Sequence, residues 1–592
     1  MELRWNLNDI YTSPEDAALL DDKKRLFAMI HSKAEQYKTF FTGKTAVADK
    51  LTDYLLTINE INSLYLKLAA FARLRLSVDT ADKAAMKLSQ ELENMMPKLS
   101  DINLPFLRFL NSVGTLDYYI EGHSLLEEHR EILRDLSVQA RHLMGEEAEQ
   151  VVSALQPSGS YAWEELHDEL TKALIVDVHI GGEIRSVPLS VARNMAYAQS
   201  RELRRAAYTA ELKAYRKCAG SIAACLNSIK GEALVTAQAR GFAHPLDVTL
   251  ADCRMERRTL DSMFHAIWNA LPDFRRYLKH KAKLLGYEGG LPFYELYAPV
   301  GRFTSRFSYE DAREIIIREF SRFSEELGDF AAHAFDFGWI DLEPREGKIS
   351  GAFTCNLHAI KESRIMVNFT GTFYDLTTIA HELGHAYHNE VLKNRTIINN
   401  DYTMPLAETA SIFCETLVTN AILSQADPEE AFAILEHNLL NYTQICVEIL
   451  ARYTFETNLF EKRKTHPLSV AELNELMLDA QRYAYGDGLT GDLHPFMWAC
   501  KPHYYFPDFH FYNFPYPYGL LFAKGLFALY EKNPGPDFVN MFNRVLYATG
   551  ASNMDEIFQI IGCPSDSLEF YGNALRLITN QIDAFCRMNL PR

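Results

Sequence analysis

The sequence of 592 residues contains few cysteines and no pattern that would pair them. Its nine cysteines are spread along the chain without a Cys-x-x-Cys pair, unlike a disulfide framework or a cysteine metal site. We therefore expect most of them to be reduced and buried, because unpaired cysteine is among the most buried residue types. Cys355 and Cys414 fall nearest the histidine motif at residues 381–385, where a ligand or nucleophile is the alternative to a small apolar filler.

A long apolar run and an excess of basic charge are also missing. No stretch approaches about 18 uninterrupted apolar residues, and residues 1–5 begin no signal segment, so we expect neither membrane insertion nor secretion and predict a cytoplasmic location. Lys and Arg number 60 against 78 Asp and Glu, a net charge of −18 that argues against general binding of nucleic acid or anionic membranes. The length exceeds one ordinary hydrophobic core, so two lobes are expected.

Most of the sequence has helical periodicity, which predicts a mainly α fold. Amphipathic spacing is clear at residues 58, 61, 65 and 68, and recurs around 80–98, 124–155, 191–240, 256–285, 309–337 and 428–463. Residues 173–188 differ, because β-prone runs flank Gly181-Gly182 and predict a hairpin. We take this hairpin as the end of an N-terminal helical lobe at residues 1–190, followed by a catalytic domain at residues 191–592.

The segment His381-Glu382-Leu383-Gly384-His385 is the most informative part of the chain. Residues four apart lie on one face of a helix, about 6 Å apart along its axis, so both imidazoles can reach a single Zn²⁺. Glu382 is offset by one helical step and can reach a water molecule rather than the metal, which suits a general base. Because 19 histidines also allow this pattern by chance, the neighbouring residues decide its meaning.

The neighbouring residues favour a helix from about Asp375 to Lys393, with Asp375 at its N-cap and no proline before Pro405. Gly384 costs such a helix about 1 kcal/mol relative to alanine. A small residue is therefore expected there if a second backbone segment must approach closely.

A third metal ligand must come from elsewhere, since catalytic zinc sites usually have three protein ligands. Glu408 is the preferred candidate, because Pro405 suits the first turn of a second helix and residues 386–407 can lay that helix beside the first. His388 is the alternative; it lies one turn beyond the motif on nearly the same face, and otherwise supports the ligands or packs. Glu415, on the same face as Glu408, is predicted to accept a hydrogen bond from a ligating imidazole, with a solvated glutamate as the alternative.

Four blocks extend the motif along the chain, at residues 5–11 (Trp-Asn-Leu-Asn-Asp-Ile-Tyr), 371–373 with 380–388, 406–411 and 511–519. Together they resemble the zinc oligopeptidases of the thimet oligopeptidase and oligoendopeptidase F group, and more closely the oligoendopeptidase F branch. The resemblance implies a two-lobed helical zincin, with a small β-sheet near the zinc helix and a deep substrate channel between the lobes. It also implies one Zn²⁺ per chain bound by His381, His385 and Glu408, Glu382 as the catalytic base, and short unfolded peptides as substrates.

An aromatic segment near the C-terminus offers donors for the oxyanion that forms during peptide hydrolysis. The resemblance favours His503, Tyr512 and Tyr516 for this role, with His510 as a substitute for His503 or as a substrate-binding residue. Phe514 stands where many relatives have tyrosine, and the spacing from His503 to the tyrosines is longer than in thimet oligopeptidase. Core or rim packing is the alternative for each of these residues.

A β-prone run at residues 364–369 precedes the predicted zinc helix. The resemblance implies a sheet edge on which a peptide substrate pairs its backbone, which makes Arg364 and Val367 candidate substrate-binding residues. An ordinary strand without a ligand is the alternative.

We predict a zinc-dependent endopeptidase that cleaves short unfolded peptides. A metallo-exopeptidase of related helical fold, a zinc enzyme with a non-peptide substrate and a non-catalytic peptide-binding protein are the alternatives. An intact base at Glu382 argues against the last of these, because capture alone needs no base. Nothing in the sequence specifies an oligomeric state.

Overall fold

The computed structural model describes residues 3–588 except residue 302, and the chain divides into two compact units of three segments each. The first unit comprises the described residues of Met1–Leu143, Ser305–Ser424 and Leu529–Pro564. The second comprises those of Met144–Thr304, Gln425–Ala528 and Ser565–Arg592. Residue 190 lies inside the second unit, so the predicted domain boundary at this residue does not coincide with a boundary between the two units. The predicted boundary stays a prediction.

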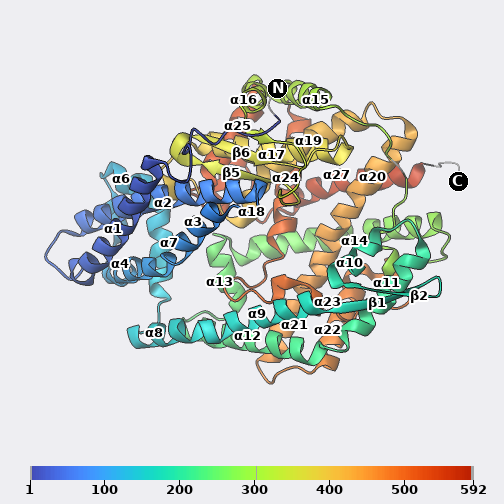
Figure 1. The fold of residues 1–592 in the computed structure, drawn as a ribbon, viewed down its shortest axis with the longest axis horizontal. Coiled ribbons are helices and arrows are strands. Elements are labelled where there is room, and N and C mark those ends of the chain that lie inside the picture. The colour runs from blue at the N-terminus through green and yellow to red at the C-terminus, as the bar shows by residue number, and fades with distance from the viewer. Residues whose placement is uncertain (1–2, 302, 589–592) are drawn as a thin grey trace. The chain divides into compact units, whose positions relative to one another are not determined.

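Helices dominate both units, as the mainly α prediction requires (Figure 1). Those of the first unit are α1 (Ala17–Phe40), α2 (Val47–Val78), α3 (Lys83–Glu93), α4 (Ser100–Ser112), α5 (Leu116–Ile120), α6 (Ser124–Glu128), α7 (Arg130–Arg141), α15 (Tyr309–Phe323), α16 (Glu325–Asp336), α17 (Phe373–Leu392), α18 (Met404–Ala407), α19 (Thr409–Leu423), α25 (Pro536–Ala548) and α26 (Met554–Ile561).

The second unit contains α8 (Glu146–Leu155), α9 (Ser160–Ala173), α10 (Leu189–Asn194), α11 (Arg201–Tyr215), α12 (Ala219–Ala239), α13 (Pro245–Asp252), α14 (Arg257–Leu284), α20 (Pro428–Thr443), α21 (Ile449–Arg463), α22 (Val470–Tyr485), α23 (Met497–Cys500) and α27 (Leu568–Arg587). A π-helical stretch, η7 (Gln444–Glu448), joins α20 to α21. Helix α24 (Pro515–Lys532) begins in the second unit and ends in the first.

The predicted periodicity at residues 58–68 is confirmed in α2, which packs against α1 and α3. Ile61 and Leu68 are fully buried and Ile58 is 8% exposed, whereas Tyr65 is only partly buried. Each fully buried aliphatic side chain contributes about 1.5–3 kcal/mol relative to exposure, so this face fixes α2 in the first unit's core. That placement matters for function because α2 also packs against strand β5 (Phe353–Leu357).

The predicted hairpin is also confirmed, in the second unit. Strands β1 (Ile175–Ile180) and β2 (Glu183–Pro188) pair antiparallel, with Ile180 opposite Glu183. Gly181 and Gly182 have φ of 57° and 83°, the two positive values that a type I′ turn requires and that glycine adopts without steric cost.

A small sheet lies beside α17, the helix that carries the histidine motif, as predicted. It contains β4 (Ile340–Asp341), β6 (Glu362–Met366) and β5 in that order, with β6 parallel to β4 and antiparallel to β5. Helix α17 packs against β5, β6 and α19 (Figure 1). In the second unit, β3 (Leu291–Pro292) and β7 (Leu489–Thr490) form a short parallel pair.

All nine cysteines are unpaired, and six of them are buried, which confirms the expectation from their spacing. Burial raises the pKa of Cys355 to about 11 and also raises that of Cys414. Both are therefore neutral thiols near pH 7, which favours the apolar filler over a ligand or nucleophile.

Candidate active site

The helix that carries the histidine motif, α17, begins at Phe373, two residues before the predicted start. Its N-cap is Thr372, whose hydroxyl accepts a hydrogen bond from Asp375 N at 3.1 Å, while Asp375 Oδ2 accepts one from Thr372 N at 3.0 Å. The assignment of Asp375 as N-cap was therefore wrong: it is the third helical residue of a capping box. The predicted helix itself is confirmed.

Glu408 lies at the junction of α18 and α19, directly after the short helix whose first turn contains Pro405. Helix α19 lies against α17 at Gly384, where an added Cβ would be 2.5 Å from Ser411 Cα and 2.6 Å from Ala410 O. Only a residue without a side chain allows this approach. The expectation that Gly384 admits a second backbone segment is confirmed, and this contact brings Glu408 to the histidines.

The structure brings the three predicted ligands together. One donor atom from each of His381, His385 and Glu408 lies within 4.8 Å of the others. Glu408 Oε2 is 3.1 Å from His381 Nε2 and 3.5 Å from His385 Nε2. The three side chains are 24%, 17% and 32% exposed, so water and a substrate can reach them.

Glu415 holds the other side of the His381 ring, with Oε2 3.0 Å from Nδ1. Nδ1–H donates to this carboxylate, so a neutral His381 ring would offer its Nε2 lone pair to a bound metal. Burial alone lowers the pKa of His381, but its hydrogen bonds with Glu408 and Glu415 outweigh burial and raise that pKa well above its ordinary value. The cluster therefore stabilises positive charge at its centre, as a metal site must.

The carboxylate of Glu382, which is 6% exposed, contacts a residue that sequence reasoning missed. Thr354 of β5 places its hydroxyl 2.7 Å from Glu382 Oε2 and 2.8 Å from Glu382 O, within reach of both acceptors. No local pattern links positions 354 and 382, so the sequence offered no signal for this contact. A second missed contact joins the Ser411 hydroxyl to Glu408 Oε2 at 3.0 Å, and here the three-residue spacing was a usable signal.

His388 lies apart from the cluster. Its ring is fully buried, stacks on Tyr402 at 4.1 Å and has Nε2 2.7 Å from Thr549 Oγ1 of the loop after α25. Burial, together with the nearby His385, lowers the pKa of His388 to about 3, so the ring is neutral. These contacts favour the packing interpretation of His388 over the alternative that it is a third ligand.

The prediction that residues 364–369 form a sheet edge was wrong. Strand β6 is central, because β4 and β5 both pair with it. The Arg364 side chain is fully buried and donates to Asn6 O at 2.8 Å and to Glu362 Oε2 at 2.7 Å, while Val367 is 2% exposed. The substrate role of Arg364 and Val367 was predicted only because this strand was expected to be an edge. The central position of β6 removes that reason.

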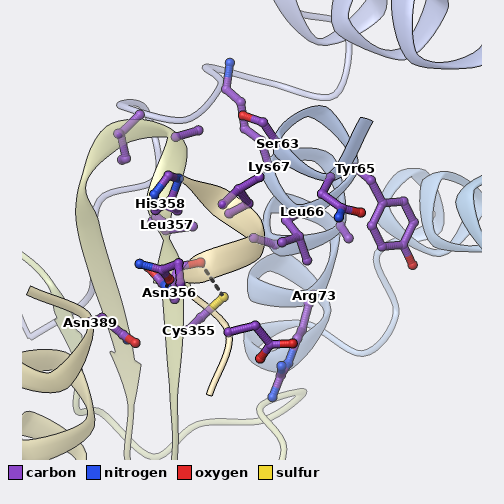
Figure 2. Close-up of a pocket in the computed structure, with 18 of the residues that line it drawn as sticks. Ser63, Tyr65, Leu66, Lys67, Arg73, Cys355, Asn356, Leu357, His358 and Asn389 are labelled. Atoms are coloured by element: carbon purple, nitrogen blue, oxygen red, sulfur yellow. Dashed lines mark hydrogen bonds between the residues drawn. The ribbon is translucent and has the colours of Figure 1, made fainter. Parts of the chain in front are cut away.

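Strand β5 is one of the two edge strands of this sheet, and it borders a cavity of about 620 Å³. Figure 2 shows side chains of α2, including Ser63, Leu66 and Lys67, on one side of the cavity and those of β5 on the other. Amide side chains recur in its lining, namely Asn62, Asn356, Asn389 and Asn400. Thr354 of β5 also lines the cavity, and its hydroxyl contacts the Glu382 carboxylate.

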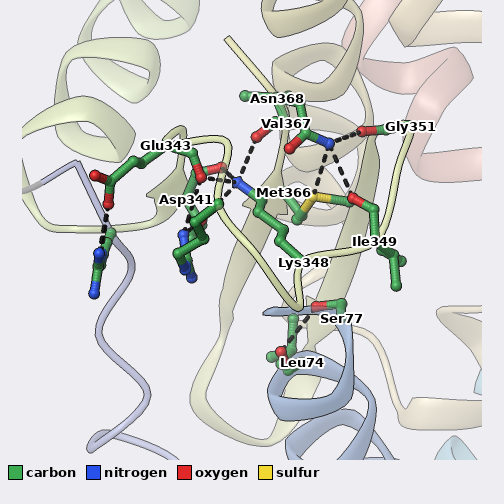
Figure 3. Close-up of polar contacts among 12 residues, drawn as sticks. Leu74, Ser77, Asp341, Glu343, Lys348, Ile349, Gly351, Met366, Val367 and Asn368 are labelled. Atoms are coloured by element: carbon green, nitrogen blue, oxygen red, sulfur yellow. Dashed lines mark hydrogen bonds and ion pairs between the residues drawn. The ribbon is translucent and has the colours of Figure 1, made fainter. Parts of the chain in front are cut away.

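The loop before β5 is fastened by a buried amine (Figure 3). Lys348 Nζ lies 2.7 Å from both Asp341 Oδ1 and Val367 O, and the side chains of Lys348 and Asp341 are fully buried. Asn368 Nδ2 donates to Ile349 O at 3.0 Å. These contacts tie the loop to the ends of β4 and β6, and so hold the start of β5.

The aromatic residues predicted as donors lie in the second unit, and three of them form a cluster. The His503 ring is 5.1 Å from that of Tyr512 and 6.2 Å from that of Tyr516. Burial lowers the pKa of His503 to about 4, helped by Arg452 and Lys501, so its imidazole is neutral. Both cations are themselves held by a buried carboxylate, that of Glu448 in η7.

His510 does not join this cluster. It is buried, with Nδ1 3.2 Å from Lys230 Nζ, and burial lowers its pKa well below the ordinary value. This environment gives no support to His510 as a substitute for His503 or as a substrate-binding residue. Phe514, at a position where the resemblance led us to expect a tyrosine, is fully buried and needs no hydrogen-bond partner.

One stretch of the described residues, Met404–Leu423, is long and apolar enough to cross a membrane, and 50% of it is buried inside the protein. It comprises α18 and α19 and packs against α17, which is the environment of a core helix.

The chain is similar to known peptidases along most of its length. Residues 194–535 match the model of peptidase family M3. The chain is 24% identical to an oligoendopeptidase F homolog of Lactococcus lactis subsp. lactis, over 98% of this chain and 96% of that protein. It is 27% identical to the chromosomal oligoendopeptidase F of L. lactis subsp. cremoris, over 65% of this chain and 64% of that protein.

A solved structure shares the fold. The oligoendopeptidase F of Enterococcus faecium superposes with a TM-score of 0.70 at 18% identity, over 96% of this chain and 98% of that one. The family match covers more than half of the 592 residues and includes the histidine motif and Glu408. The chain therefore belongs to peptidase family M3, in its oligoendopeptidase F branch, and is a metallo-endopeptidase.

Proposed function

We propose that this peptidase uses one Zn²⁺ per chain, held by His381, His385 and Glu408, to cleave short unfolded peptides at internal bonds. The observation that carries the proposal is the convergence of two imidazoles and one carboxylate within 4.8 Å, with Glu415 orienting His381. Two imidazoles and a carboxylate form a recurrent catalytic zinc set, in which the fourth position stays open for water or substrate. Imidazole ligands suit Zn²⁺ better than Mg²⁺ or Ca²⁺, which prefer oxygen.

Each residue around the metal ligands has a defined task in this proposal. When bound, Zn²⁺ supplies Lewis-acid polarisation of the scissile carbonyl and of the attacking water. Glu382 takes the proton from that water and returns it to the leaving amine. The Thr354 hydroxyl holds Glu382 Oε2, which leaves Oε1 to carry the proton. No covalent intermediate with the protein is required.

His503, Tyr512 and Tyr516 are the proposed donors to the oxyanion. The support is their mutual proximity, together with a neutral His503 ring that has an N–H to donate. Preorganised donors of this kind are each worth roughly 10²–10³ in turnover.

For the substrate we propose an extended peptide whose backbone pairs with the open edge of β5, in place of the β6 edge that sequence reasoning favoured. The support is the unpaired side of β5 beside a cavity lined by amide side chains. Backbone pairing tolerates many sequences, because main-chain groups supply the hydrogen bonds. Short peptides suit a chain with a relative named an oligopeptidase, and a cytoplasmic location is part of the same proposal.

The variant Glu382→Gln tests the proposal, because it keeps the size of the side chain and removes its basicity. We expect it to bind one zinc per chain and to lose cleavage of a quenched fluorescent peptide by several orders of magnitude. Turnover near that of the wild type would refute the role of Glu382. Mass spectrometry of wild-type products should show internal cuts, and ladders from one terminus would indicate an exopeptidase instead.

A further inference from the structure

The loop between η9 (Pro502–Tyr504) and α24 carries Tyr512, and the residue before it has an unfavourable backbone conformation. Phe511 has φ of 56° and is 1% exposed. Among the described residues only Arg254 and Lys361 are other non-glycine residues with positive φ, and neither is buried. The left-handed region costs a residue with a side chain about 1–2 kcal/mol, so the surroundings must hold Phe511 in place.

The peptide group between His510 and Phe511 is held at both of its polar atoms. His510 O accepts a hydrogen bond from Thr249 Oγ1 of α13 at 2.8 Å. Phe511 N donates to Glu456 Oε1 of α21 at 3.2 Å. Because the carbonyl and the amide belong to one planar unit, these two bonds fix the orientation from which the chain continues to Tyr512.

Lys230 of α12 completes the arrangement. Its Nζ lies 2.7 Å from the same Glu456 Oε1 and 3.2 Å from His510 Nδ1, and the two charged side chains are 0% and 1% exposed. A buried ion pair contributes little net stability and is often replaced by apolar residues without loss. Its presence here is therefore better explained by what it orients.

We propose that Lys230 and Glu456 are positioning residues for catalysis: the pair holds the strained turn at Phe511, and the turn directs Tyr512 to His503 and Tyr516. This inference rests on the proposed donor role of Tyr512. A displacement of about 1 Å in a reacting group can cost about 10²-fold in rate. The pair therefore controls kcat without contacting the substrate.

Two double variants test the pair while avoiding an unpaired buried charge, which would cost about 3–5 kcal/mol. Lys230→Met/Glu456→Gln keeps an acceptor oxygen for Phe511 N, and Lys230→Met/Glu456→Leu removes it. We expect the Gln form to stay within about threefold of wild-type kcat and the Leu form to fall by about 10- to 100-fold. KM and bound metal should be unchanged in both.

A matched control is available in the same unit. Lys281 and Glu436 form a buried pair at 2.6 Å, with side chains 0% and 8% exposed, and neither contacts the loop by any described bond. Lys281→Met/Glu436→Leu should leave kcat within about twofold of wild type. An equal loss of kcat in this control would overturn the proposal, because the effect would then be general softening of the unit.

The variant Tyr512→Phe separates this inference from the proposed function. If the pair acts through Tyr512, the Leu form should cost less than about twofold in the Tyr512→Phe background, a strong departure from additivity. Wild-type turnover in Tyr512→Phe alone would overturn the donor role and the inference with it. Only the inference would be overturned if Tyr512→Phe lowers kcat but the Leu form alone has wild-type kcat. The same holds if the Leu form lowers kcat by the same factor in the Tyr512→Phe background as in the wild type.

Thr249→Val keeps the test valid even where the Leu form does not fold. It removes only the hydroxyl that holds His510 O and leaves the ion pair intact. We expect kcat to fall by about 3- to 10-fold, again with no further effect in the Tyr512→Phe background. Unchanged kcat in folded Thr249→Val would contradict the proposal.

Discussion

Gly384→Ala is the most direct test of how the fold builds the metal cluster. The new Cβ would be 2.5 Å from Ser411 Cα and 2.6 Å from Ala410 O, both in the backbone of α19. Carbon atoms pack best at about 3.5–4.0 Å, so α17 and α19 must separate by roughly 1 Å. Because Glu408 directly precedes α19, the separation moves it away from His381 and His385.

Two opposing effects set the size of the change. Alanine favours the helix interior by about 1 kcal/mol over glycine, whereas overpacking a close contact costs about 1–3 kcal/mol or more. Here the clash is with backbone atoms that cannot rotate away, so we expect net destabilisation of about 1–2 kcal/mol. Metal sites tolerate ligand shifts of only about 0.2 Å, so metal affinity should fall by at least about 10- to 100-fold.

Competition with a chromophoric chelator would measure the affinity, and thermal unfolding with and without metal would measure the stability. Gly572→Ala is the matched control, because Gly572 lies within α27 and an added Cβ there meets nothing within 4 Å. We expect the control to be as stable as the wild type or more so, with unchanged metal affinity. Wild-type affinity and raised stability in Gly384→Ala would refute the reasoning.

Three further predictions concern neighbouring residues. Glu408→Gln removes the charge but not the volume, and metal analysis after dialysis should show lost affinity; full retention would move the third ligand elsewhere. Thr354→Val should lower kcat by about 10-fold or more with metal content unchanged, because a hydrogen bond to a charged group is worth about 1.5–3 kcal/mol. Thr354→Ser keeps the hydroxyl and should keep kcat near that of the wild type. Equal kcat values in the two variants would show that the hydroxyl is irrelevant. Burial lowers the pKa of His388 from 6.5 to about 3. Between these pH values the unfolded chain binds more protons than the folded chain. The free energy of unfolding should therefore decrease as pH falls, by up to about 1.4 kcal/mol per pH unit. His388→Gln should weaken this pH dependence. Urea titrations at several pH values would measure it, and the same change in unfolding free energy per pH unit in both proteins would contradict this origin.

Features with a local pattern could be predicted from the sequence. The helical spacing of His381 and His385, the turn residues of the hairpin and the proline before Glu408 each report on a few neighbouring positions. Pro405 and the length of residues 386–407 favoured Glu408 over His388, the resemblance to oligoendopeptidase F implied the same ligand, and the structure places Glu408 within reach of both histidines. The contact between Glu415 and His381 could also be predicted, because Glu415 lies on the same helical face as Glu408.

Features that depend on distant contacts could not be predicted. Strand β6 is central because a two-residue strand, β4, pairs with its far side, and so short a strand has no sequence pattern. Thr354 reaches Glu382 only because β5 lies against α17. The turn at Phe511 is likewise set by residues on α12, α13 and α21, and its own side chain argues against a positive φ.

The proposal that substrate pairs with the edge strand β5, and not with β6, links two parts of the proposed mechanism. If substrate pairs with β5, one strand holds both the peptide backbone and, through Thr354, the Glu382 carboxylate. The distance between the base and the scissile bond is then set within a single strand, so it does not depend on two elements keeping register. The buried Lys348 amine, which ties the loop before β5 to Asp341 and Val367, fixes where that strand begins (Figure 3). Loosening this loop should therefore displace base and substrate together, which lowers kcat less than it raises KM, whereas loss of the Thr354 hydroxyl should lower kcat alone.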